Sequence, residues 1–149
     1  MTDSALILLT AAILSAVTTG FYASQIRRLD ADGPERLIGE LRLSQWMALL
    51  LAVMGSIPVG LAIAANAGPL GNVDISEGIV FVVLAGMVLQ SEPRTALALA
   101  IAGFIAHALT DIAHRPGWLS TAVLPQWYAA GCGAFDVVIA ALCYWARRR

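Results

Sequence analysis

Residues 46–65 read WMALLLAVMGSIPVGLAIAA, twenty consecutive residues without a charged side chain. A helix of this length rises about 30 Å, which matches the hydrocarbon thickness of a bilayer. Four further stretches of the chain are nearly as apolar, at residues 5–23, 75–90, 95–114 and 128–146. The sequence therefore predicts an all-α integral membrane protein, in which residues 1–149 form one polytopic bundle of five transmembrane helices.

The composition of the whole chain agrees with this class. Hydrophobic residues make up 59% of the 149 residues, charged residues make up 13%, and the mean hydropathy is +0.78. These values exclude a disordered chain and a disulfide scaffold, and they argue against a soluble domain. A net charge of −1 offers no basic surface, so no nucleic-acid partner is expected. All nine basic residues are arginines, and without a lysine no Schiff base with retinal or pyridoxal can form.

The placement of the arginines predicts the orientation. Five crossings put eight of the nine arginines on one side of the membrane and leave only Arg115 on the other. The third stretch is the shortest and has Glu77 in its first turn. If it did not cross, Arg94 and the three C-terminal arginines would move to the far side. The positive-inside rule therefore favours five spans, with the N-terminus outside and the C-terminus inside, in a bacterial cytoplasmic (inner) membrane.

The longest polar segment, residues 24–45, is the expected cytoplasmic connector between the first two spans. From Pro34 onward, three apolar residues fall on one helical face, and Arg36 and Glu40 form an i,i+4 pair on another. This pattern indicates a short amphipathic helix on the membrane surface. A solvated connector without such a helix explains the composition equally well.

Small residues are frequent along the spans. Gly55, Pro58 and Gly60 predict a kink or a close helix contact in the second span, although ordinary packing also accounts for them. Five helices enclose little volume, so either the substrate is small or two copies assemble. We expect a homodimer, because close helix contacts are permitted by Gly103, Ala106, Ala129, Ala130, Gly131 and Gly133.

Three ionisable carboxyl groups remain inside the spans or at their edges: Asp111, Asp136 and Glu77. An aspartate at the centre of a membrane helix costs about 2.5–3.5 kcal/mol on insertion scales. Such residues are rare and face protein or water rather than hydrocarbon. The three carboxyl groups are therefore candidates for function.

The fourth and fifth spans present matching polar stripes. At 100° per residue, Asp111 lies about 40° from His107, and His114 lies about 20° to the other side. On the fifth span, Tyr128, Cys132 and Asp136 form a similar stripe. Antiparallel packing brings His107 and Asp136 together near the middle of the bilayer, and it brings Asp111 and His114 close to Cys132 and Tyr128. Glu77 approaches from the same outer side.

Three interpretations of this convergence stay open. The polar side chains can be purely structural, with Asp111 paired to Arg115 and His107 bonded to Asp136. They can bind a divalent metal, because the i,i+3 spacing of Asp111 and His114 lets both ligate one ion, with Glu77 as a further ligand. They can also do acid–base work without a cofactor, since a carboxyl and a nearby imidazole can exchange a proton.

The favoured function is that of an enzyme acting on a lipophilic small molecule, such as an isoprenoid or a lipid, by isomerisation, cyclisation or hydrolysis. The partners expected for such an enzyme are membrane lipids and this substrate. No cofactor is required for acid–base chemistry, and a divalent metal is the alternative. The catalytic candidates are His107, Asp111, His114 and Asp136, and the substrate-binding candidates are Glu77, Trp118, Trp127, Tyr128 and Cys132.

Two other function classes use the same residues. A proton-coupled transporter or channel for a small solute would switch access when a carboxylate takes up a proton. An accessory subunit of a larger membrane complex would use the polar stripe for contacts only. A nucleophilic role for Cys132 is weaker than its role as a small apolar side chain, because cysteine commonly fills such positions.

Overall fold

The computed structural model describes residues 3–66, 68–114 and 125–148, with the backbone alone at residues 69 and 70. The described chain forms five helices and contains no strand: α1 (Asp3–Arg27), α2 (Pro34–Ala64), α3 (Gly68–Gln90), α4 (Pro93–Ala113) and α5 (Gln126–Arg147). Each helix is long and apolar enough to cross a membrane. The prediction of an all-α chain with five candidate transmembrane helices is therefore confirmed.

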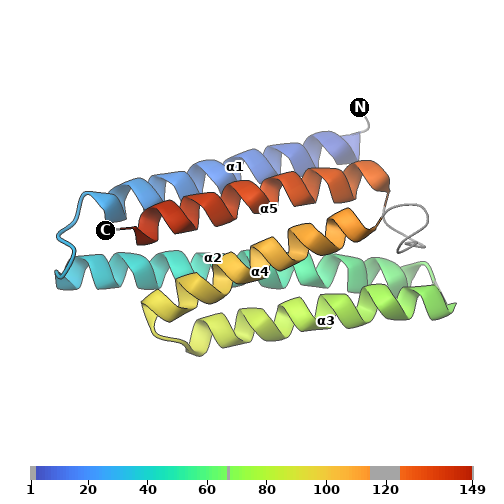
Figure 1. The fold of residues 1–149 in the computed structure, drawn as a ribbon. Helices are drawn as coiled ribbons and strands as arrows, with labels where there is room; N and C mark the ends of the chain where they lie inside the picture. The colour runs from blue at the N-terminus through green and yellow to red at the C-terminus, as the bar shows by residue number, and fades with distance from the viewer. Residues whose placement is uncertain (1–2, 67, 115–124, 149) are drawn as a thin grey trace.

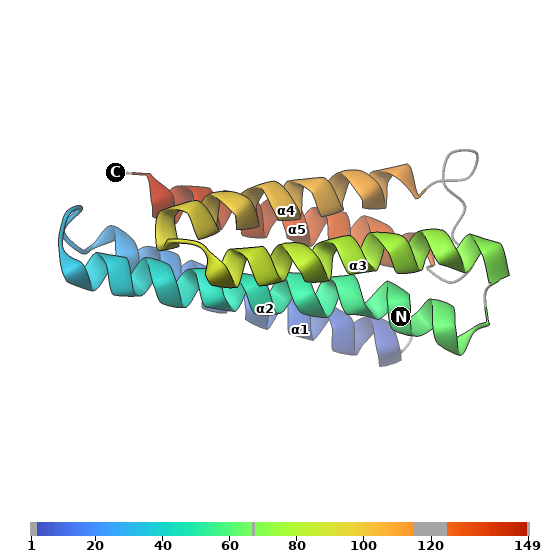
Figure 2. The same ribbon diagram turned by 90° about the horizontal axis from the view of Figure 1, so that it is seen from below.

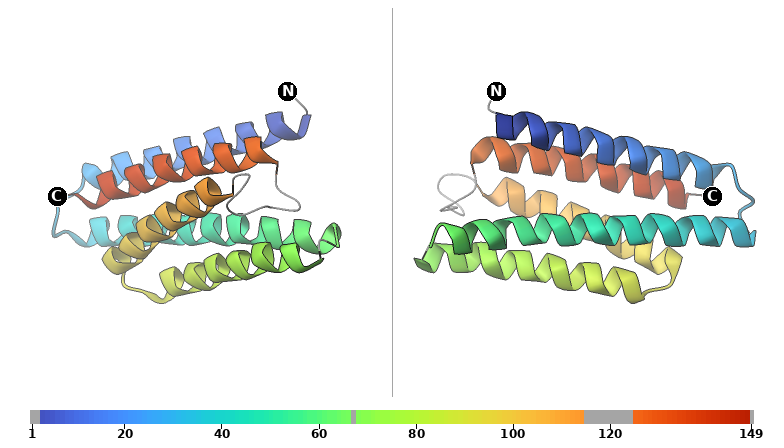
Figure 3. Two further views of the ribbon diagram at one scale, coloured as in Figure 1. Left: turned by 45° about the vertical axis from the view of Figure 1, so that its right-hand side comes forward. Right: turned by 180° about the vertical axis from the view of Figure 1, so that it is seen from behind.

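Successive helices run in opposite directions (Figure 1). α2 packs against α1, α3 and α4, while α5 lies between α1 and α4. Figures 2 and 3 show the same neighbours from other sides. We call the end with the α1–α2 connection, the α3–α4 connection and the C-terminus the arginine end, because Arg27, Arg36, Arg94 and Arg148 lie there. The opposite end, where α4 reaches His114, is called the histidine end.

The third helix is longer than its apolar stretch. It begins at Gly68 and has 23 residues, so it rises about 34 Å and is long enough to span. The apolar stretch predicted from the sequence covers residues 75–90, with Glu77 in its first turn and Asp74 just outside it. The helix includes both residues, and Asp74 is only 1% exposed, with Oδ1 of its carboxyl group 3.8 Å from Nε2 of His114.

The polar connector also differs from its prediction. Residues from Pro34 onward are helical, but they belong to α2, which continues without interruption to Ala64 and through Pro58. The structure shows neither a separate surface helix nor a solvated connector at these residues. Arg36 and Glu40 are buried and joined by an ion pair of 2.9 Å, so the polar turns can pack inside the bundle as the start of the second span.

The predicted close contact in the second span is present between Gly55 on α2 and Gly78 on α3. A Cβ atom added to Gly55 would lie 2.7 Å from the carbonyl oxygen of Gly78, which is closer than real Cβ atoms approach. The two backbones meet here because neither residue carries a side chain.

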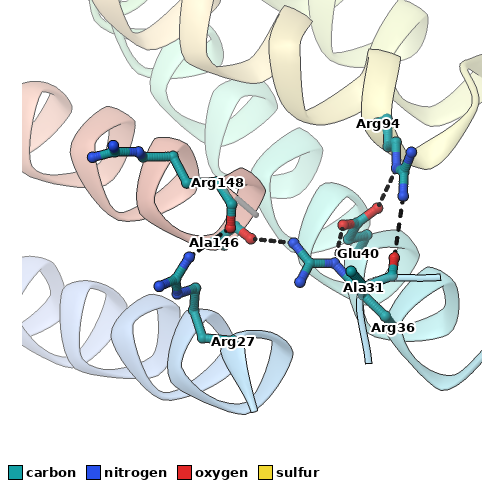
Figure 4. A network of polar contacts seen from close by, with 7 residues as sticks. All are labelled: Arg27, Ala31, Arg36, Glu40, Arg94, Ala146 and Arg148. Carbon is teal, nitrogen blue, oxygen red and sulfur yellow. Dashed lines mark hydrogen bonds and ion pairs between the residues drawn. The ribbon is translucent and has the colours of Figure 1, made fainter. Parts of the chain in front are cut away.

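A network of arginine contacts joins four helices at the arginine end (Figure 4). The Arg36 guanidinium pairs with Glu40 and donates to the carbonyl of Ala146 at 3.1 Å. Arg94 approaches the second carboxylate oxygen of Glu40 at 3.7 Å. Arg27 donates to the carbonyl of Arg148 at 2.6 Å, so two arginines satisfy carbonyl groups at the C-terminus of α5.

The core changes in character along the bundle. Between the buried Arg36–Glu40 pair at the arginine end and the middle of the bundle, the core is mostly apolar, with side chains such as Leu43, Met47, Leu97, Phe104 and Ile139 fully buried. Beyond Phe104 five polar side chains are buried next to apolar ones such as Ala108 and Ala129, and they are Asp74, His107, Asp111, His114 and Asp136. These five residues form the candidate functional site in the half of the bundle that includes the histidine end.

Candidate functional site

Three polar side chains of α4 face the interior of the bundle along one stripe. His107, Asp111 and His114 are 6%, 7% and 8% exposed. Their spacing of four and three residues places them on one side of the helix, and His114 lies about 10 Å beyond His107 along the axis. Each histidine meets carboxyl groups from a neighbouring helix, so the stripe supports two clusters.

The first cluster, which we call the His107 triad, consists of His107, Asp111 and Asp136. The Nδ1 atom of His107 is hydrogen-bonded to Oδ2 of Asp136 at 2.8 Å, and Oδ2 of Asp111 lies 3.3 Å from the same nitrogen. An imidazole nitrogen carries at most one hydrogen, so the two carboxyl groups compete for a single donor. The ring of His107 packs edge-on against Phe81, with centroids 4.7 Å apart.

The charge balance of the His107 triad requires protons or a cation. Asp136 is 0% exposed, and its Oδ1 atom has no hydrogen-bond partner among the described residues. Two carboxylates and a neutral imidazole carry a charge of −2, which takes two further protons or a divalent cation to neutralise, and buried charge is costly when it is unpaired. The ligand atoms of the three residues lie within 4.8 Å of one another, which is also compatible with a bound metal.

The second cluster, which we call the His114 triad, consists of His114, Asp74 and Glu77. The Nε2 atom of His114 lies 3.4 Å from Oε2 of Glu77 and 3.8 Å from Oδ1 of Asp74. Neither ring nitrogen has a hydrogen-bond partner within the described part of the chain. The sequence analysis missed Asp74. The i,i+3 spacing of Asp74 and Glu77 could have revealed it, because this spacing puts both carboxyl groups on one helical face.

A groove of about 550 Å³ runs between α4 and α5 beside both triads. Asp111 and His114 line it from α4, and small residues of α5 leave the space open. Its exposed rims include Ile112 and Val137, which are 48% and 52% exposed, so the groove opens on the side of the bundle. The full lining is Asp111, Ile112, His114, Gln126, Ala129, Ala130, Gly133, Ala134 and Val137.

A second depression lies on the other side of α4, between α3 and α4, and has a volume of about 510 Å³. Glu77 and Thr110 contribute to its lining. The His114 triad therefore lies between two surface openings, with His114 at one and Glu77 at the other.

The predicted substrate-binding residues of α5 lie apart from the lining of the groove. Tyr128 and Cys132 are partly buried. Trp127 is 51% exposed and packs edge-on against Tyr128. Trp118 and Arg115, the predicted partner of Asp111, fall outside the described residues.

The structure divides the metal-binding set predicted from the sequence. His114 and Glu77 lie together, as expected, and Asp74 joins them. Asp111 instead approaches the imidazole of His107. His107 and Asp136 meet directly, which is the pairing that antiparallel packing of the two stripes predicts.

The geometry permits two kinds of chemistry, namely proton transfer at the His107 triad and cation binding at either triad. Comparison of the chain with protein-family models, with curated proteins and with solved structures finds no match.

Proposed function

We propose that the protein is a membrane enzyme that uses acid–base chemistry to convert a lipophilic small molecule by isomerisation, cyclisation or hydrolysis. The observation that carries the proposal is the position of Asp111. The residue lines the groove between α4 and α5, and its buried Oδ2 atom lies 3.3 Å from Nδ1 of the buried imidazole of His107. Asp111 thus connects the groove between α4 and α5 to the buried His107 triad.

The lining of the groove suits a mostly apolar molecule. Alanine, glycine, isoleucine and valine make up most of it, and the polar lining residues are Asp111, His114 and Gln126. Ligand sites of about 300–1,000 Å³ with mainly apolar walls and a few polar groups are typical of small-molecule binding. A substrate can enter sideways between the helices and present its reactive group to Asp111.

Each member of the His107 triad has a separate task in this mechanism. Asp111 is the catalytic residue, because it touches the substrate and gives or takes the proton. His107 exchanges that proton with Asp111, and Asp136 holds the imidazole in place through the 2.8 Å hydrogen bond. With both carboxyl groups ionised and the imidazole neutral, the buried triad carries a charge of −2, and two added protons make it neutral. The triad can therefore store a proton for transfer.

The apolar half of the core favours an enzyme over a proton-coupled transporter. Alternating access requires an aqueous path to each face in turn. Leu51, Leu97 and Phe104 are 0% exposed and fill the interior between the His107 triad and the arginine end. In vesicles that contain the protein, we expect proton flux no greater than in empty vesicles.

The proposed orientation follows the arginines. With the arginine end in the cytoplasm of a bacterial cell, the described arginines comply with the positive-inside rule. The N-terminus then lies outside, and both triads lie in the outer half of the inner membrane. The substrate would reach the groove from the outer leaflet.

The test is conversion of a lipid by purified protein. Wild-type protein in detergent is incubated with a total lipid extract of bacterial membranes, and mass spectrometry follows the species that are consumed and formed. We expect a substrate–product pair with the wild type, and none with Asp111→Asn. Asp30→Asn, which makes the same chemical change at an exposed position, should retain conversion. Identical lipid profiles with the wild type and Asp111→Asn would overturn the proposal.

A further inference from the structure

We propose that Asp74, Glu77 and His114 bind one divalent metal ion, and that Zn²⁺ fits the three ligands. The inference is independent of the proposed function, because metal binding is measured without turnover. It concerns the His114 triad, whereas proton transfer was assigned to the His107 triad.

His114 faces both acids at distances longer than hydrogen bonds, whereas the carboxylate oxygens of Asp74 and Glu77 are not within 4.8 Å of each other, so Glu77 must move toward Asp74 to complete a site. The Nε2 atom of His114 lies 3.4 Å and 3.8 Å from carboxylate oxygens of Glu77 and Asp74. A hydrogen bond from nitrogen to oxygen is typically 2.7–3.2 Å long. Two ligands bound tetrahedrally to Zn²⁺, each at about 2.0–2.1 Å, lie about 3.4 Å apart. Glu77 is partly exposed and has rotatable bonds with which to close on an ion.

The unpartnered atoms of the triad give an independent reason. The side chains of His114 and Asp74 are only 3% and 2% exposed. Both ring nitrogens of His114 and the Oδ2 atom of Asp74 have no hydrogen-bond partner among the residues that the structure describes. Leaving a buried polar atom unpaired costs about 1–3 kcal/mol. An ion bound by Nε2 and the carboxylates would satisfy several of these atoms at once.

The charge of the triad points to a cation in particular. Two carboxylates and a neutral imidazole carry a charge of about −2, which is costly to bury without compensation. Arg36 and Arg94 pair with Glu40 at the arginine end, far from the His114 triad. A divalent cation neutralises the two carboxylates, and an imidazole with two carboxylates is a ligand set that Zn²⁺ accepts.

The His107 triad is a weaker metal site although its ligand atoms are close together. The 2.8 Å separation of His107 and Asp136 is that of a hydrogen bond, so a hydrogen already occupies the space between these two atoms. The two triads lie about 10 Å apart along α4 and can be distinguished by mutation.

Metal bound at the His114 triad would be placed for chemistry. Three protein ligands leave a fourth position of Zn²⁺ for water or another molecule, which is the pattern of catalytic zinc sites. His114 lines the groove between α4 and α5, and Glu77 lines the depression between α3 and α4. The fourth position is therefore reachable from the surface of the bundle.

The experiment measures Zn²⁺ binding to the purified, chelator-treated full chain in detergent, by equilibrium titration and by elemental analysis of the washed protein. We expect one Zn²⁺ per chain in the wild type. Loss of a residue that only supports a metal ligand costs about 10–100-fold in affinity, and loss of a ligand itself costs more. Asp74→Asn and His114→Ala should therefore weaken binding by more than about 100-fold. Asp136→Asn and Asp111→Asn should leave the affinity unchanged.

A second pair of variants covers the case that a buried substitution prevents folding. Glu77→Gln changes the most exposed ligand and should abolish the rise in Tm that Zn²⁺ produces in the wild type, while Glu92→Gln at an exposed position should keep it. The proposal is overturned if the wild type binds no Zn²⁺. It is equally overturned if Asp136→Asn loses the metal while Asp74→Asn and Glu77→Gln retain it, because the ion would then lie in the His107 triad.

Discussion

The Nδ1 atom of His107 lies 2.8 Å from Oδ2 of Asp136, although the two residues are 29 positions apart in the chain. Their hydrogen bond joins α4 to α5 at the level where the apolar core gives way to polar side chains. The pair does not stand alone, since Asp111 reaches the same imidazole nitrogen and also lines the lateral groove. This connection distinguishes the cluster from a simple contact between two helices.

The first prediction concerns the two buried members of the triad. Asp136→Asn preserves the shape of the side chain but removes the negative charge that balances the imidazole. Positioned proton transfer contributes about 10²–10⁴-fold to catalysis, so we expect lipid conversion to fall by that factor. His107→Ala should abolish conversion and lower the free energy of unfolding by about 1–3 kcal/mol, because it leaves Asp136 without its partner.

Measured conversion rates and thermal unfolding of the two variants test this expectation. Cys143→Ala, on the same face of α5 as Asp136 but in the apolar core, is the control and should keep its activity. Full turnover by both Asp136→Asn and His107→Ala would remove these residues from the mechanism.

The second prediction concerns the space in the groove. Ala134 lines the groove between α4 and α5, and Ala141 lies two turns further on the same face of α5, is exposed and does not line that groove. Ala134→Leu should fill part of the groove and reduce conversion at least tenfold, a ratio equivalent to about 1.4 kcal/mol. Ala141→Leu should leave the rate unchanged. Equal rates for the two variants would show that the substrate binds elsewhere.

The third prediction concerns the network at the arginine end. Glu40 is 2% exposed and pairs with Arg36, which in turn donates to Ala146. Removing one partner of a buried ion pair costs about 3–5 kcal/mol because the other charge stays buried. Glu40→Gln should therefore unfold at clearly lower denaturant or temperature than Glu35→Gln, its matched control at an exposed position. Equal stability of the two variants would contradict the structural role of the pair.

The fourth prediction concerns the contact between α2 and α3. Gly55→Ala places a methyl group 2.7 Å from the carbonyl oxygen of Gly78, and such overpacking typically costs about 1–3 kcal/mol. Gly60→Ala has no atom within 4 Å of the new methyl group and should stabilise the helix by up to about 1 kcal/mol. Opposite changes in Tm are expected, and a Gly55→Ala protein as stable as the wild type would contradict the close approach.

The five helices could be predicted from the sequence because apolar runs of membrane length are a strong and local signal. The start of α3 and the union of the connector with α2 could not. Both places contain buried polar residues. Asp74 faces His114, which lies 40 positions away in the chain, and Arg36 pairs with Glu40 one turn along the same helix. Polar residues in the sequence suggest that a helix ends there, but paired polar side chains can be buried inside a continuous helix.

The candidate site was predictable where helical periodicity determines it. The polar stripes of α4 and α5 predict that His107 faces Asp136, and this prediction does not depend on the structure of the loops. The carboxyl groups that meet His114 depend on how α3 packs against α4, which periodicity within one helix does not reveal. The groove arises from small residues such as Ala130 and Ala134, which sequence alone associates with close helix contacts instead.

Catalysis by Asp111 requires that its carboxyl group is reached from hydrocarbon through the groove between α4 and α5. Carbodiimides modify protonated carboxyl groups, and the reagent can be chosen to partition into the membrane or to stay in water. Protein in lipid vesicles is treated with dicyclohexylcarbodiimide or with a water-soluble carbodiimide, and the modified peptides are mapped by mass spectrometry.

We predict that dicyclohexylcarbodiimide modifies Asp111 but not the fully buried Asp136, that the water-soluble reagent modifies neither, and that Ala134→Leu slows the reaction while Ala141→Leu does not. Unmodified Asp111 after treatment with the lipid-soluble reagent, or equally fast modification by the water-soluble one, would contradict a catalytic carboxyl group reached from the membrane.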